Sequence, residues 1–148
     1  MADNSRYYWI KLRTDFFNEE TIEYILSQKR GCEYIVLYEM LCLRTANNNG
    51  ELSTKIGEMI IPYDVEKIVR DTKYFASSTV TAALELFKKL GLIYEFDNSG
   101  ILRIYNYDKM VGSENADSHA QRQKRYKANK KKREASPEAS PEASQKVT

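Results

Sequence analysis

The 148-residue sequence has little of what several protein classes require. Its two cysteines and six glycines are too few for a disulfide scaffold or a collagen-like repeat. No segment approaches the roughly 18 consecutive apolar residues of a membrane span, and charges are scattered through the first 20 residues, unlike a signal peptide. We therefore expect a cytoplasmic protein with no membrane partner, in which Cys32 and Cys42 are reduced core thiols.

Combinations of residues that carry catalysis or bind cofactors are missing as well. The one histidine, His119, lies in a polar region, and there is no Cys-x-x-Cys pair, no Walker-type phosphate loop and no Gly-x-Gly-x-x-Gly. The acidic pair Glu19 and Glu20 is typical of a helix start. We expect no enzyme, no metal site and no cofactor.

The net charge of +2 is unevenly distributed along the chain. Residues 1–110 contain 14 basic and 16 acidic residues, whereas residues 118–133 contain eight basic residues and no acidic one. From Gly112 onward, Val147 is the only aliphatic residue larger than alanine. Such a segment buries too little apolar surface to offset the entropy lost on ordering. The composition predicts a folded domain over 1–111, a disordered basic tail over 112–133 and a low-complexity Ser/Pro/Glu/Ala spacer over 134–148.

The apolar pattern of the first 111 residues predicts a mainly α fold with a small β-sheet. A strand is expected over 7–12, helices over about 19–29, 33–46, 62–71 and 77–90, a short strand over 51–53, and a hairpin of 92–96 with 101–105. The predicted helix boundaries depend on Asn18 as N-cap, Gly31 as a left-handed end, Pro62 in a first turn, Ser77 or Ser78 as cap, and Gly91 as the last stop. A short helix, a tight turn, a longer helix and a hairpin match a winged helix-turn-helix domain.

In that arrangement the helix after the tight turn enters the major groove of DNA. Its outward face, the cations around it and the wing give these candidate DNA-binding residues: Lys73, Ser77, Ser78, Thr79, Thr81, Ala82, Glu85, Lys88, Lys89 and Arg103. Ser and Thr hydroxyls can reach phosphates or base edges, and Lys and Arg neutralise the backbone.

The basic tail is a second candidate site for nucleic acid. Its residues are Arg122, Lys124, Arg125, Tyr126, Lys127, Lys130, Lys131, Lys132 and Arg133. Tyr126 could stack on an unpaired base, which makes single-stranded DNA a candidate partner beside duplex DNA. Six phosphate contacts would give a slope of about −5 in a plot of the logarithm of the DNA-binding constant against the logarithm of salt concentration. A nuclear address is an alternative use of the same composition.

Several motifs resemble the N-terminal domain of phage replisome organisers. They are residues 6–12 (RYYWIKL) followed by 15–17 (DFF), the apolar segment 34–43 ending in 48–50 (NNG), residues 80–84 (VTAAL) with 90–93 (LGLI), and 111–114 (VGSE) before Arg125 and Tyr126. The resemblance covers about residues 5–127. It implies a phage or prophage replication-initiation protein in a bacterial host cell, similar in architecture to DnaD-type primosomal proteins. Such proteins bind origin DNA and help recruit the replicative helicase or its loader. Family members usually continue into a C-terminal domain, whereas this chain ends in a spacer.

Two other functions remain open at this point. The domain could be an oligomerisation or protein-docking module of a primosome, with Tyr7, Tyr8 and Trp9 as the interface and self-association as the outcome. It could also be a transcriptional regulator, because the fold alone does not separate replication from transcription.

Overall fold

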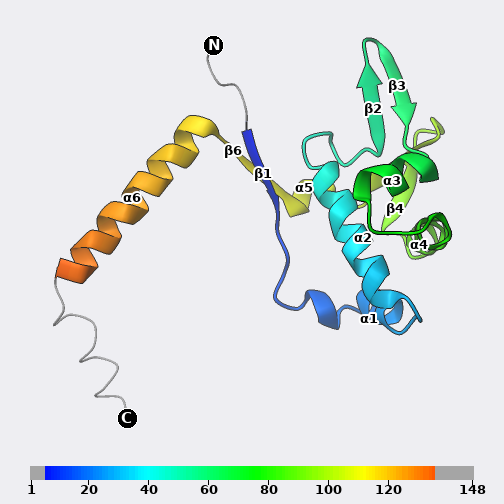
Figure 1. The fold of residues 1–148 in the computed structure, drawn as a ribbon, viewed down its shortest axis with the longest axis horizontal. Coiled ribbons are helices and arrows are strands. Elements are labelled where there is room, and N and C mark those ends of the chain that lie inside the picture. The colour runs from blue at the N-terminus through cyan, green and yellow to red at the C-terminus, as the bar shows by residue number, and fades with distance from the viewer. Residues whose placement is uncertain (1–5, 136–148) are drawn as a thin grey trace. The chain divides into compact units, whose positions relative to one another are not determined.

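The computed structural model describes residues 6–135, except for the side chains of residues 116, 117 and 119. Within this range the fold is mixed α/β, with helices α1–α6 and small two-stranded sheets (Figure 1). Its contacts divide into a body over residues 8–112 and a second unit that contains Arg6, Tyr7 and residues 113–135. No helix in the described part is long and apolar enough to cross a membrane.

The helical half of the body contains a 3-10 turn, η1 (Phe16–Asn18), followed by α1 (Glu20–Leu26) and α2 (Gly31–Arg44). Fully buried aliphatic residues from α1 and α2 form much of the core, and the Tyr38 and Phe87 rings meet edge to face at 5.7 Å. The prediction of Asn18 as N-cap is wrong, because Asn18 ends η1 and Glu19 is the N-cap of α1.

The sequence predicts that Gly31 ends the first helix, but in the structure Gly31 begins α2. A Cβ atom at this position would overlap the backbone of Ile25 and Leu26. Glycine is therefore required by the close approach of α2 to the end of α1, rather than by a left-handed backbone.

The two cysteines, both free, lie in different environments on α2. Cys42 is buried, as predicted, and burial raises the pKa of its thiol to about 12. Cys32 is exposed, which corrects the prediction of a core thiol. The two cysteines are ten positions apart on α2. At 3.6 residues per turn, this spacing leaves their side chains about 80° apart around the helix axis, so one can face the core while the other faces solvent.

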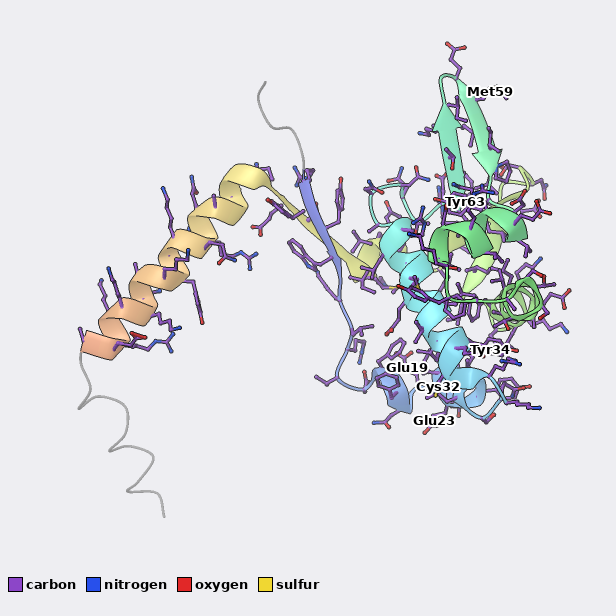
Figure 2. All side chains as sticks on the ribbon, in the orientation of Figure 1. Glu19, Glu23, Cys32, Tyr34, Met59 and Tyr63 are labelled. Atoms are coloured by element: carbon purple, nitrogen blue, oxygen red, sulfur yellow. The ribbon has the colours of Figure 1, made fainter. Side chains whose placement is uncertain are left out.

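A hairpin that the sequence did not predict follows α2. It pairs β2 (Ser53–Ile56) with β3 (Met59–Pro62) in antiparallel register and projects away from the helices, with Met59 near its tip (Figures 1 and 2). Pro62 ends β3 and is not in a helical first turn, which corrects the predicted start of the next helix. That helix, α3 (Val65–Thr72), starts after Asp64, whose carboxylate accepts a hydrogen bond from the Lys67 N–H at 2.8 Å.

The predicted hairpin of residues 92–96 with 101–105 is confirmed, and it is the second hairpin along the chain. Helix α4 (Ser77–Lys89) leads through Gly91, at φ 78°, into β4 (Ile93–Phe96), which pairs antiparallel with β5 (Ile101–Ile104). The chain near Leu52 lies beside β5, since the Leu52 N–H donates to the Leu102 carbonyl at 2.7 Å and the Ile104 N–H to the Gly50 carbonyl at 2.8 Å. The predicted short strand at 51–53 is thus found mainly as this edge contact.

The last elements correct the prediction of a disordered tail. After α5 (Tyr107–Met110), β6 (Val111–Asn115) pairs with β1 (Arg6–Ile10), and α6 (Ala116–Ala135) follows. The composition of α6 explains the difference, because Ala, Lys, Arg and Gln are good helix formers and a solvated helix needs no apolar core. Most of the predicted spacer, residues 136–148, lies outside the described residues.

Candidate nucleic-acid interface

Helix α4 is fixed by one buried face. Val80, Ala83, Leu84 and Phe87 are buried on this helix. The N-cap is Ala76, with no side-chain cap, so the predicted capping role of Ser77 or Ser78 is wrong. Both serine side chains are therefore left on the exposed start of the helix.

The outward face of α4 contains most of the predicted contact residues. Exposed positions along it are Ser77, Ser78, Thr81, Ala82, Glu85, Lys88 and Lys89. The Thr81 hydroxyl donates to the Ser77 carbonyl at 2.9 Å, which leaves its oxygen free only to accept. This face is thus polar, exposed and made mostly of small side chains.

Thr79 lies on the other side of the helix and is only 5% exposed. It is four residues before Ala83 and eight before Phe87, so the helical repeat aligns it with the buried face. The prediction that Thr79 points outward is wrong, and a direct contact of its side chain with DNA would require the helix to rotate.

The turn before α4 presents Lys73 and Tyr74. Lys73 adopts the left-handed conformation, with φ 71°, at the end of α3, and its side chain is exposed. Tyr74 is 77% exposed, the largest value among the exposed large hydrophobic residues of the described chain. Tyr74 is not among the contact residues that the sequence predicts, although it lies between two predicted helices.

Ion pairs hold α3 in place behind this turn. The Asp71 carboxylate accepts from Lys67 at 2.9 Å on its own helix and from Arg44 of α2 at 3.0 Å. The hydrogen bond from Lys67, helped by the charge of Arg44, lowers the pKa of Asp71. The link fixes α3 against α2 and so supports the turn that leads into α4.

Arg103 on β5 has partners inside the body. Its guanidinium contacts the Glu51 carboxylate at 2.9 Å and lies 3.7 Å from the centre of the Phe96 ring. Both charged side chains are about one-fifth exposed, at 21% and 18%. The sequence predicts that Arg103 contacts the DNA backbone. Because its guanidinium is already engaged by Glu51 and Phe96, we leave Arg103 out of the candidate interface.

Helix α6 brings the predicted basic residues onto one exposed element. Its start is capped, because the Asn115 side chain accepts a hydrogen bond from the Ser118 N–H at 2.7 Å. Arg122 is held by Glu114 at 2.6 Å. The remaining seven cations form no ion pair with any side chain that the structure describes; they are Lys124, Arg125, Lys127, Lys130, Lys131, Lys132 and Arg133. Tyr126 among them is 58% exposed.

The aromatic residues of β1 are about half exposed. Tyr7, Tyr8 and Trp9 have exposed fractions of 47%, 41% and 38%. Trp9 also packs on Gly112, where a Cβ atom would overlap the indole ring. Part of the Trp9 surface is thus used within the body, while the rest is available to a partner.

No group of three or more His, Cys, Asp and Glu side chains is arranged to hold a metal ion in the part of the chain that the structure describes. The absence of a cofactor stays a prediction.

The comparisons with known proteins give one family. Neither a curated protein nor a solved structure matches the chain. The family described as the N-terminal phage replisome organiser matches residues 9–134, which include the body and nearly all of α6. The resemblance seen in the sequence is confirmed, and the chain belongs to the N-terminal phage replisome organiser family.

Proposed function

We propose that this protein initiates phage or prophage DNA replication by binding origin DNA in the cytoplasm of the bacterial host. The observation that carries the proposal is the family match over residues 9–134, which gives the chain a replication-related role. The lack of a catalytic constellation in the sequence favours a binding role over an enzymatic one. A footprint inside an origin, rather than at a promoter, would separate this function from transcriptional regulation.

We interpret the body as a winged helix-turn-helix. The order α3, turn, α4, β4, β5 supports this interpretation, and so does the edge contact of the chain near Leu52 with β5. In this fold α4 would lie in the major groove and the β4–β5 hairpin would be the wing. Ser78 and Thr81 would face base edges or phosphates, Glu85 would face base edges, and Lys73 and Lys88 would contact the backbone.

A charge placed at the start of α4 tests this mode of binding. We expect Ser78→Glu to keep or raise thermal stability, because an acidic residue favours a helix N-terminus. The same carboxylate would repel phosphate and raise the Kd for duplex DNA about tenfold, or about 1.4 kcal/mol. Fluorescence anisotropy with a labelled duplex and a thermal melt measure the two effects.

The chain offers a matched control on another helix. Cys32 is the exposed second residue of α2, as Ser78 is the exposed second residue of α4. Cys32→Glu adds the same charge at an equivalent helical position and should leave the Kd unchanged. Equal loss of affinity in both variants would point to total charge and against α4 as the DNA-reading helix.

A docking role is the second candidate function, and it can coexist with DNA binding. The half-exposed aromatics of β1 favour it, as does the β2–β3 hairpin, where Ile56 is 60% and Met59 is 64% exposed. The candidate partners are a second copy of this chain, the replicative helicase and its loader. A constant monomer mass over a wide concentration range would exclude self-association.

A further inference from the structure

Helix α6 has no apolar face. Every side chain that the structure describes between Ser118 and Ala135 is exposed, and the apolar residues among them are Tyr126 and scattered alanines. A helix that packs on a protein partner, forms a coiled coil or lies on a membrane needs a continuous apolar stripe. The partner of α6 must therefore be recognised by charge.

The charges within α6 oppose the helix when no partner is present. Lys127 is three residues from Lys124 and Lys130 and four from Lys131, and like charges at these spacings destabilise a helix. The good intrinsic propensities of lysine, arginine and alanine favour the helix only weakly. Neutralising the cations would remove the repulsion and leave the favourable propensity, so an anionic partner would stabilise α6.

The start of α6 is held locally. The Asn115 side chain accepts from the Ser118 N–H in the first turn at 2.7 Å, and Glu114, just before the helix, pairs with Arg122 in the second turn at 2.6 Å. In the remainder of the helix, Glu134 is the only acidic residue after Asp117. The helix thus has a defined start and a long cationic remainder that a polyanion can order.

We propose that α6 binds duplex DNA as a continuous helix lying in the major groove. The inference rests on the proposed function and adds the form of the segment and its nucleic-acid class. Twenty residues of helix span about 30 Å, and the major groove admits an α-helix. At 3.6 residues per turn, the seven cations that have no ion pair with the described side chains point around the whole circumference, so they can meet phosphates on both walls of a groove.

A single strand fits α6 less well. Proteins that hold unpaired bases do so with several aromatic side chains that form stacking platforms. Tyr126 is the only aromatic residue of α6. Duplex DNA is therefore the occupant that the charge arrangement favours, and a single strand is the alternative outcome of the test.

The test breaks the helix without changing its charge. Ala128 is exposed in the middle of α6, and Ala128→Pro removes a backbone donor and interrupts the helix there. Ala116→Pro is the matched control, because proline is well tolerated at the first position of a helix. Both variants are made in the full chain, and a thermal melt checks that the rest of the chain stays folded.

Anisotropy titrations use a duplex and a single strand of equal length, and circular dichroism at 222 nm follows helix content. We expect duplex DNA to increase the helical signal of the unmodified chain. Ala128→Pro should weaken duplex binding about tenfold while changing single-strand binding little, and Ala116→Pro should behave like the unmodified chain.

The possible failures are distinct. Duplex binding by Ala128→Pro as tight as that of the unmodified chain would overturn the inference while leaving the proposed function intact. A larger loss of single-strand than of duplex affinity would assign α6 to single strands and also overturn it. Absence of any DNA binding by the unmodified chain would overturn the proposed function itself.

Discussion

Arg103 illustrates how a single side chain can have contacts that the sequence does not predict. As a basic residue on a predicted wing it resembles a phosphate contact, yet its guanidinium pairs with Glu51 and covers the ring of Phe96. Glu51 and Phe96 lie 52 and seven residues away, so no local pattern reveals the contact. Arg103 therefore joins the β4–β5 hairpin to the chain that precedes β2.

The structure predicts that Arg103 contributes to stability more than to DNA affinity. Arg103→Gln would leave the Glu51 carboxylate largely buried without its cation, which should lower the free energy of unfolding by about 1–3 kcal/mol. Urea titrations measure this loss, and anisotropy with duplex DNA should give a nearly unchanged Kd.

Two further variants make the residue-scale test specific. The double variant with Glu51→Gln removes both charges and should recover part of the lost stability. Lys88→Gln, at an exposed position without an ion pair in the described chain, should leave stability unchanged. A stability loss in Lys88→Gln equal to that in Arg103→Gln would contradict the assignment.

At the scale of elements, Asp71 makes the contact between α2 and α3 depend on pH. Its folded pKa lies below the ordinary value of 3.8. The stability that it contributes is thus present above the unfolded pKa and is lost as the pH falls through the folded pKa. Asp71→Asn should unfold at lower urea than the unmodified chain at pH 7, with a gap that narrows below about pH 4.

Urea titrations at several pH values between 7 and 2 measure that gap. Asp97→Asn is the control, because Asp97 is exposed in the turn between β4 and β5 and has no ion pair in the described chain. Its effect on stability should not change with pH in the same way. A gap for Asp71→Asn that persists at pH 2 would rule out the carboxylate as its source.

The elements differ in how much the sequence reveals about them. The inward stripe of α4 and the β4–β5 hairpin could be predicted, because each has one buried face and a clear turn. The β2–β3 hairpin could not, since Ile56, Met59, Ile60 and Ile61 are all exposed and give no alternation of buried and solvated positions. Pro62 added to the error, because proline suits the end of an edge strand as well as a helical first turn.

Helix α6 was missed for a different physical reason. As its scarcity of apolar residues predicts, α6 packs on no core, and the described side chains of residues 118–135 are exposed. Burial decides whether a segment packs, however, and helix propensity with a cap can order a segment that does not pack. The Asn115 cap was visible in the sequence as an asparagine before an alanine- and lysine-rich run.

For the whole molecule, the separation of charge between the two units is the dominant feature. Residues 1–110 are net acidic, whereas α6 contains the basic block. Replacing Lys130, Lys131 and Lys132 together with glutamine should make the salt slope of DNA binding less negative by about 2 to 3. The melting midpoint should change little, because glutamine also favours helices and these side chains are exposed.

A matched triple variant in the body distinguishes local from total charge. Lys29, Lys55 and Lys109 are exposed lysines outside the proposed interface. Their combined replacement with glutamine lowers the net charge equally and should leave the salt slope as it was. Equal changes of slope in the two triple variants would argue against α6 as the main phosphate-binding element.

The pairing of β1 with β6 has a consequence for how the protein is made. During translation β1 leaves the ribosome before β6, which is synthesised about one hundred residues later, a delay of roughly 5–20 s. Throughout that interval the edge of β1 and its aromatic side chains have no native strand beside them. The nascent chain is thus exposed to mispairing or chaperone capture until residues 111–115 emerge, whereas the hairpins β2–β3 and β4–β5 can close as soon as they are synthesised.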